Sequence, residues 1–466
     1  MNKIKQSITL ILLICCFSNL SGQETLTLEQ CRAMALENNK EIAIAAQNKE
    51  MAMTSVKSYR ANFLPRISAM GLGYYATGQN DVKIKIDDIQ LYDPSSISGY
   101  IPPFLSFLTP YIDQFSSVSV PDMDFNLKLN NTYMAGVFVE QPVFMGGKIT
   151  TAYKMSKIGN ELSTLSQQLT EAEVIVQTDD AYWLYVKATE LHKSATKYKE
   201  VLDEFYRMIE NAWKGGMKSQ NDALKVQVKL NEAELQVLQA SNGVRLARMN
   251  LCHIIGIPLS SDVPLPETFD EALSGINREA GITTRPEYAM LNKQIEFKDR
   301  QVKLVRSDFL PNIGVSGGYS YAYGMRLNNE PLMNSASFSA VVSVKIPLFH
   351  WGEGAYKIRM ANYERKIAEM QRDELSEKMQ LELMQALNIY EEAAMEVALT
   401  TRSLEQAEEN LRVSRNHYEA GMTTLAEHLE AQTLWQKASS DLINAKAKMK
   451  LSETRYLKAS GTLTIH

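Results

Sequence analysis

The sequence predicts a mixed α and β membrane protein in which long coiled-coil helices continue a transmembrane β-barrel. Three observations carry this prediction: a structural unit that occurs twice, helix-forming stretches far longer than a globular helix, and short segments that alternate polar and apolar residues. After the N-terminal apolar run, no segment of the 466 residues is apolar enough to cross a bilayer as a helix. A membrane-spanning form must therefore be built from strands.

Three motifs of the first half return in the second half. They are Phe-Leu-Pro at 63–65 and 309–311, Pro-x-Phe at 142–144 and 347–349, and Gly-Met at 216–217 and 421–422. The last two motifs share an offset of 205 positions, whereas the first has an offset of 246, so one insertion of 41 positions lies between Tyr75 and Val139. Equal spacing of unlike motifs predicts two tandem repeats, 23–256 and 284–466, joined by a linker at 257–283.

The N-terminus is typical of an export signal, which we expect to cover 1–22. Two lysines precede an apolar run at 8–17 that is too short to span a bilayer as a helix, and cleavage is expected near Gly22. Cys15 and Cys16 leave a lipid-anchored cysteine as the alternative. Simple cleavage is favoured because neither cysteine follows the small residue that lipidation signals usually carry.

Composition argues against several classes of function. The chain holds 54 acidic and 49 basic residues without a basic patch, so no nucleic-acid partner is expected. Cys31 and Cys252 remain after signal removal; one disulfide is an option, but two buried free thiols are favoured. No metal-ligand spacing, phosphate loop or Gly-x-Ser-x-Gly motif is found, so we expect no cofactor and no enzyme activity. His417 and His428 are interpreted as surface imidazoles.

Long helices are predicted over 147–214 and 352–420, because both stretches lack proline and consist mainly of strong helix formers. Each would be roughly 100 Å long. In the second, the apolar positions from Met379 to Leu411 step by four and three, a period of 3.5 that lets helices wrap around each other. Shorter helices are expected at 28–62, 221–255, 286–308 and 425–460.

Period-two alternation predicts strands over 66–78, 131–144, 312–323 and 337–348. One face is apolar and the other mostly small and polar, which suits a lipid-facing outside and a wet inside. A half-buried sheet would also alternate, but aromatic residues cluster at both strand ends, as in outer-membrane barrels. The insertion at 79–129, rich in proline and aromatic residues, is expected to be an extracellular loop.

Four strands cannot close a membrane barrel, and open sheet edges are not tolerated in lipid, so several copies must share one barrel. Two copies give eight strands, whose interior is nearly filled by side chains. Three copies give twelve strands, the smallest total that leaves an open lumen, and four copies remain compatible with the physics. The long helices would extend this barrel as a tube into the periplasm.

Several segments resemble TolC-like outer-membrane efflux proteins. They are Pro-Val-Phe-Met-Gly-Gly at 142–147, Pro-Leu-Phe-His-Trp-Gly at 347–352, the run from Trp213 to Leu224, and the Tyr-x-x-Gly run that begins at Tyr418 and leads to acidic residues. The resemblance implies a homotrimer in outer-membrane lipid, with a shared twelve-stranded barrel and a helical tunnel. It also implies an exit duct for efflux or type I secretion that works with a periplasmic adaptor and an inner-membrane pump.

The resemblance also implies functional residues at the periplasmic end. It places Glu427 and Glu430 at an acidic ring of the aperture, and Asp222 and Tyr418 among the residues that lock it. The adaptor would contact the hairpin tips, at Gly215, Gly216, Met217, Lys218, Gly421, Met422 and Thr423. Two features depart from the family: glutamate stands in place of aspartate, and Thr423 replaces an arginine lock partner, for which Lys218 is the candidate substitute.

Two other classes of function compete with an exit duct. A periplasmic coiled-coil adaptor or scaffold without a barrel would explain the heptads but not the alternating strands, the aromatic clusters or the long loop. A soluble periplasmic enzyme would need a catalytic constellation that the sequence does not show. For the two glutamates alone, the alternative to an aperture is a solvated helix face.

Overall fold

The computed structural model describes residues 25–75, 81–84, 125–265, 269, 281–327, 330–333 and 335–463; the expected signal segment lies outside these ranges. No helix in the described ranges has both the length and the apolar character needed to cross a membrane. The chain divides into two compact units. The helical unit consists of 1–46, 167–288 and 375–466, and the strand unit of 47–166 and 289–374.

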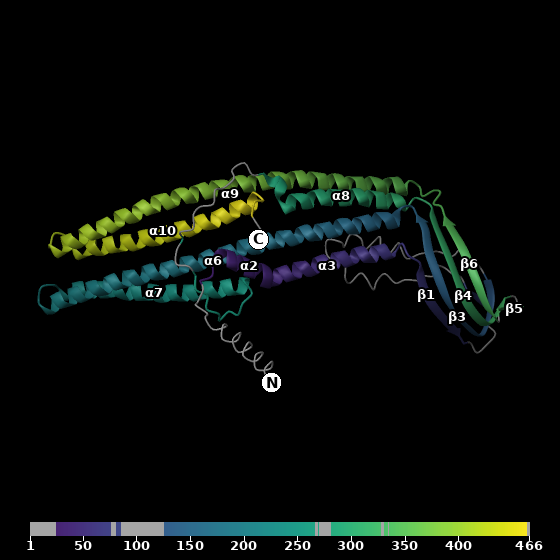
Figure 1. The fold of residues 1–466 in the computed structure, drawn as a ribbon, viewed down its shortest axis with the longest axis horizontal. Coiled ribbons are helices and arrows are strands. Elements are labelled where there is room, and N and C mark those ends of the chain that lie inside the picture. Colours follow the sequence, from purple (N-terminus) through teal and green to yellow (C-terminus); the bar gives the residue numbers. More distant parts are fainter. Residues whose placement is uncertain are drawn as a thin grey trace, which may run out of the picture. The chain divides into compact units, whose positions relative to one another are not determined.

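The strand unit holds an antiparallel sheet (Figure 1). Its long strands are β1 (Arg66–Tyr74), β3 (Phe125–Met145), β4 (Asn312–Leu327) and β6 (Ala336–Lys345), which lie side by side in that order. Two short strands, β2 (Asp81–Ile84) and β5 (Glu330–Met333), pair with the remote ends of β3 and β4. The sheet is therefore four strands wide along its length, and each repeat supplies two of them.

The strand bounds differ from those expected. β3 begins at Phe125 and β4 reaches Leu327, because the two strands continue to pair beyond the region where their alternation is clear. β1 ends at Tyr74, and 76–80 lie outside the described residues. β6 ends at Lys345, since Pro347 has no N–H for a further ladder bond. Of the expected loop at 79–129, the structure describes only β2 and the start of β3.

The register puts the apolar alternation on one face of the sheet. Val137 of β3 lies opposite Tyr319 of β4, which in turn lies opposite Phe338 of β6. These side chains are 50%, 61% and 75% exposed in the single chain. An uncovered face of this size needs an apolar environment, and lipid supplies one. On the other face, β4 carries mainly serine and glycine.

The helices show the internal repeat in their lengths. The two long helices, α6 (Lys148–Lys214) and α9 (Glu353–Glu419), have 67 residues each. The two return helices, α7 (Gln220–Ile254) and α10 (Leu425–Ala459), have 35 residues each. A further helix, α8 (Pro286–Ser307), precedes β4. The expected bounds of these helices lie within one residue of the observed ones.

The helix expected over 28–62 is instead two helices, α2 (Leu28–Asn38) and α3 (Lys40–Ala61). Asn39 between them is extended, with φ −69° and ψ 132°. Its side-chain oxygen accepts from the backbone N–H of Glu41 at 2.8 Å, and its amide donates to the carbonyl of Ile254 at 2.9 Å. Asparagine competes with helical hydrogen bonds in this way, which explains the interruption.

The heptad seam of α9 is confirmed by burial. All ten seam positions are buried or half-buried: Met379, Leu383, Ala386, Tyr390, Ala393, Val397, Thr400, Leu404, Ala407 and Leu411. Towards its end the seam meets a cluster that includes Leu202 of α6, Leu230 of α7 and Trp435 of α10. Each long helix and the return helix that follows it form a hairpin, α6–α7 and α9–α10, and both hairpins share this core (Figure 1).

A second core lies near the start of α2. It contains Tyr182 and Trp183 of α6 together with Cys31 and Cys252, which are both buried and free. Beside this core, the buried carboxylate of Asp179 accepts two hydrogen bonds from Arg32 and one from Thr454 at 2.6 Å. The favoured interpretation of the cysteines as free buried thiols is confirmed.

Candidate functional site

The two hairpins reverse direction through the same kind of turn. Gly216 and Gly421 have φ values of 77° and 74°, in the left-handed region that glycine favours. In each turn the following methionine N–H donates back to a helix carbonyl, Met217 to Ala212 and Met422 to His417, both at 2.8 Å. These bonds terminate the long helices and leave both methionine side chains about three-quarters exposed. The turns thus present an apolar side chain at each tip.

The return helices begin with capping hydrogen bonds that involve the predicted acidic residues. At α7, the Ser219 hydroxyl accepts from the backbone N–H of Asp222 at 3.1 Å. At α10, Thr424 and Glu427 form a capping box, in which the Glu427 carboxylate accepts from the Thr424 N–H at 3.2 Å and also from the Thr423 hydroxyl. These bonds, led by the one from Thr423, lower the pKa of Glu427. Glu427 therefore has a structural task at the start of α10.

The remaining predicted acid, Glu430, lies one turn further along α10 and is exposed. Acidic groups near a helix N-terminus are favourable because they face the positive end of the helix dipole. Asp222 occupies the equivalent first turn of α7 and is half-buried. The dipole accounts for an acid at Asp222, in the first turn of α7, but it falls off before Glu430, in the second turn of α10. An aperture role for either acid rests on the assembly.

Tyr418 is the predicted site residue that the fold places at a contact between the hairpins. Its ring is 7% exposed and stacks on His428, with centroids 5.6 Å apart and an interplanar angle of 15°. Phe205 of α6 packs edge-on against it at 5.4 Å. The Lys218 ammonium, from the turn of the other hairpin, lies 4.6 Å from the centroid of the same ring. Lys218 thus makes a cation–π contact across the hairpins, and its role as a substitute for the arginine lock partner stays a prediction.

His428 is buried, with 2% exposure, so its interpretation as a surface imidazole is wrong. Its Nδ1 lies 3.2 Å from the Ser414 hydroxyl and its Nε2 lies 3.1 Å from the Gln432 amide nitrogen. Burial lowers the pKa of His428, nearby Arg415 lowers it further, and Glu419 opposes both. Phe205, Lys218, Ser414, Tyr418, His428 and Gln432 are called the tip cluster below.

Sequence spacing could have identified His428 as a core residue. Leu425, Ala431, Gln432 and Trp435 are buried on α10, and His428 falls between the first two at a spacing of three. A residue in such a stripe faces the core whatever its polarity. His417, by contrast, is exposed as expected.

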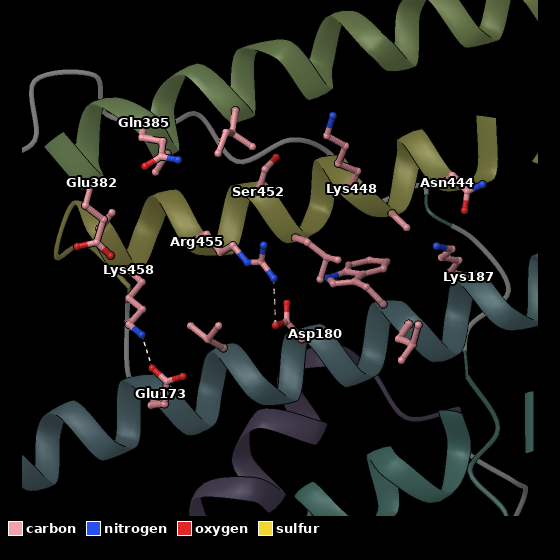
Figure 2. A pocket seen from close by; sticks show the side chains of 18 residues that line it. Glu173, Asp180, Lys187, Glu382, Gln385, Asn444, Lys448, Ser452, Arg455 and Lys458 are labelled. Atoms are coloured by element: carbon pink, nitrogen blue, oxygen red, sulfur yellow. Dashed lines mark hydrogen bonds and ion pairs between the residues drawn. The ribbon is translucent and has the colours of Figure 1, made fainter. Parts of the chain in front are cut away.

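The helical unit also contains a cavity of about 610 Å³ between α6, α9 and α10 (Figure 2). Figure 2 shows Arg455 directed at Asp180, at 3.4 Å, and Lys458 at Glu173, with which it forms an ion pair. Burial raises the pKa of Asp180, and Arg455 opposes that shift. These charged side chains pair with one another instead of converging on one point, so the lining of the cavity has a structural role and does not form a ligand site. Within the described ranges, no group of three or more His, Cys, Asp or Glu side chains could hold a metal ion.

The model of the family "Outer membrane efflux protein" matches residues 32–257 and 282–462. The chain belongs to the outer membrane efflux protein family. This confirms the resemblance to TolC-like proteins that the junction and tip motifs indicated.

A curated relative, the alkaline protease secretion protein AprF of Pseudomonas aeruginosa, is 22% identical over 333 residues, which is 68% of this chain and 67% of AprF. Among solved structures, CusC matches with a TM-score of 0.74 at 13% identity, covering 93% of this chain and 91% of CusC. The outer membrane channel CmeC of Campylobacter jejuni matches with a TM-score of 0.71 at 17% identity, covering 94% and 89%.

These findings confirm the predicted fold class, in which a strand-built membrane part is joined to long helices in two tandem repeats. The efflux protein is an exit duct in the bacterial outer membrane, with its helical tunnel on the periplasmic side. The competing prediction of a periplasmic adaptor or scaffold is not supported, because the family model that matches most of the chain is that of outer membrane efflux proteins.

Proposed function

We propose that three copies of this efflux protein form one duct, which a periplasmic adaptor and an inner-membrane pump complete as a tripartite export system. The observation that carries the proposal is the state of the sheet edges. In the described residues, β1 pairs only with β3 and β6 only with β4, so both long edges of the sheet are open within one chain. Open edges are not tolerated in lipid, so neighbouring copies must supply the missing pairs.

The exposed apolar side chains of the helical unit support the same assembly. On α7, Leu224, Val228, Leu235, Leu238 and Leu246 are each more than half exposed and recur at helical spacing. On α9, residues outside the heptad seam are similarly exposed, including Leu381, Met384 and Met395. Stripes of this kind on a single chain indicate contacts with other copies.

The number of copies follows from the requirement that the barrel has an open lumen. Twelve strands are the smallest total that leaves an open passage, whereas eight strands would fill it with side chains. The test is the mass of the protein extracted from outer membranes in mild detergent, together with its migration before and after heating. We expect a trimer that is converted to monomer by heat. A stable monomer in the outer membrane, or a soluble periplasmic rod, would contradict the proposal.

The hairpin tips are proposed to contact the adaptor. The exposed side chains of Met217 and Met422 offer two flexible apolar contacts per chain. A photo-crosslinking residue placed at Met217 or Met422 in living cells should capture an adaptor-class protein, identified by mass spectrometry. The same probe at Glu234, exposed on α7 and 17 residues after Met217, is the control and should not. If neither tip position captures an adaptor-class protein, the proposed contact between the tips and the adaptor is contradicted.

Glu430, Asp222 and Tyr418 are proposed to form the periplasmic aperture, with Glu427 supporting it through the capping box. Three exposed copies of Glu430 around an axis would repel one another and attract cations. The cargo is proposed to include polypeptides, since AprF is named for protease secretion, whereas the family name indicates export without a chemical class of cargo. The proposal gives the chain no catalytic step.

A further inference from the structure

We propose that the tip cluster is an acid-sensitive latch, in which neutral His428 holds the two hairpins together and its protonation releases them. The inference deepens the proposed function, because it assigns a means of regulation to the aperture end of the duct. It rests on the burial of one imidazole that packs against Phe205 of the other hairpin, while its hydrogen bonds, to Ser414 and Gln432, hold it in place within the α9–α10 hairpin.

The imidazole joins elements that are far apart in the sequence. His428 of α10 packs against Phe205 of α6, with ring centroids 4.7 Å apart, and stacks on Tyr418 of α9. Lys218, from the α6–α7 turn, covers the ring of Tyr418. Both hairpins therefore contribute to one stack, and opening the tip requires these contacts to separate.

The hydrogen bonds of His428 fit its neutral form. The Gln432 amide nitrogen is only a donor, so Nε2 of His428 must accept from it. Nδ1 then carries the hydrogen and donates to the Ser414 hydroxyl. A second proton, on Nε2 of His428, would make it a donor that faces another donor, the amide nitrogen of Gln432. The Gln432 amide would then have to rotate, or the contact would have to break.

The charges around the imidazole oppose its protonation. Arg415 on α9 disfavours the charged form of the imidazole and Glu419 on α9 favours it, and these two side chains also form an ion pair with each other. The side chains that α6 and α7 bury in this core are Phe205, Ile209, Ala223 and Val226, which are apolar, and the half-buried Tyr206 of α6 packs against them. The buried position therefore offers the imidazolium little compensation for lost water.

The direction of the pH effect follows from linkage. The pKa of His428 in the closed tip lies below its ordinary value near 6.5. Above that value the imidazole is neutral whether buried or exposed, so the latch has its full strength. As the pH falls below it, only an exposed imidazole takes up the proton, and the equilibrium shifts towards the open tip by up to roughly tenfold per unit of pKa difference.

The experiment is hydrogen–deuterium exchange of the purified full-length protein between pH 7.5 and 5.5, corrected for the intrinsic effect of pH. In wild type, we expect the opening equilibrium of peptides covering 205–222 and 414–432 to rise by roughly threefold to tenfold at the lower pH. His428→Phe keeps an aromatic ring but cannot titrate, so its tip should be insensitive to pH. His417→Gln removes the exposed neighbouring histidine and should behave as wild type.

A wild-type tip whose exchange does not change with pH, or a His428→Phe tip that responds as strongly as wild type, would overturn the latch. If His428→Phe does not fold, His428→Gln takes its place, and the wild-type titration decides on its own. Single-channel recordings then link the latch to transport, with the pH varied on the periplasmic side. A protein that forms no trimer would contradict the proposed function, whereas the exchange measurement would still decide the latch.

Discussion

Arg32 of α2 and Asp179 of α6 form a two-pronged ion pair, with N–O distances of 2.7 and 2.5 Å, across 147 positions of sequence. The Asp179 carboxylate is fully buried and also accepts from Thr454 of α10. The pair thus joins the start of the first repeat to the end of the second. A buried charge with several partners is strongly coupled to the fold, because removal of one partner leaves the other without compensation.

Substitution of Asp179 is therefore expected to destabilise the helical unit. Asp179→Ala removes the acceptor of two hydrogen bonds from Arg32 and of one from the Thr454 hydroxyl, at a cost of about 3 kcal/mol. The measurement is thermal or urea unfolding of the detergent-solubilised protein, followed by circular dichroism. Asp180→Asn is the matched control, because its partner Arg455 is 61% exposed, and such pairs contribute about 1 kcal/mol or less. Equal losses in both variants would contradict this account.

The turn glycines give a second prediction. Gly421→Ala would place a side chain on a residue with φ 74°, at a cost of about 1 kcal/mol, although a new Cβ would meet nothing within 4 Å. Gly243→Ala in the middle of α7 also meets no neighbour, but its backbone is helical, so this variant should be more stable by about 0.5–1 kcal/mol. Opposite signs in the unfolding free energies would separate backbone strain from packing.

The capping box at α10 predicts a local effect at the second tip. Thr424→Ala removes the acceptor for the N–H of Glu427 and should cost about 1 kcal/mol. Hydrogen exchange of the first turn of α10 should accelerate accordingly. Thr433→Ala, on an exposed position of the same helix, should leave that exchange unchanged within about 0.5 kcal/mol. Indistinguishable exchange in the two variants would show that the box does not hold this end.

The proposed aperture predicts a change in ion block. Glu430→Gln should weaken block by a trivalent cation on the order of tenfold, because three charges near the axis are lost. Glu427→Gln should have a smaller effect, since that carboxylate is engaged by Thr423 and Thr424. Glu408→Gln, exposed on α9, serves as the control in planar-bilayer recordings. Unchanged block in Glu430→Gln would remove this acid from the passage.

The buried cysteines predict chemical inertness. Burial raises the pKa of Cys31 to about 12, with Asp179 and Cys252 contributing, and burial also raises the pKa of Cys252. Since the thiolate is the reactive form, neither thiol should react with maleimide at pH 8 until the protein unfolds. Met217→Cys, at an exposed tip position, should react at once. Rapid labelling of the folded wild type would contradict the burial of both thiols.

The positions of the helices can be predicted from the sequence better than the contacts between them. The seam from Met379 to Leu411 follows one period, and periodicity depends only on neighbours along the chain. Local sequence does not predict the break at Asn39, because its side-chain amide finds a partner in Ile254, more than two hundred positions away. The ion pair of Arg32 with Asp179 is equally remote, and no local pattern distinguishes these residues from other charged ones.

In the strands and at the tip, too, local patterns are predictable from the sequence and remote contacts are not. Alternation located β4 and β6 closely, but it did not show that β3 starts at Phe125, because that extension depends on pairing with β2 and β4. At the tip, the motif around Tyr418 marks a residue that lies at a contact between the two hairpins, and its role at an aperture stays a prediction. That motif does not show that His428 stacks on Tyr418, because the buried stripe of α10, and not the polarity of the imidazole, sets the position of His428.

The two hairpins match in length but differ in chemistry where they turn. The first return helix starts with Ser219 and Asp222, and the second starts with the Thr424 and Glu427 box. A ring of three chains would therefore display six tips of two alternating kinds. A ligand that grips every tip would meet threefold rather than sixfold symmetry, so its copies must either number three or bind in two non-equivalent ways.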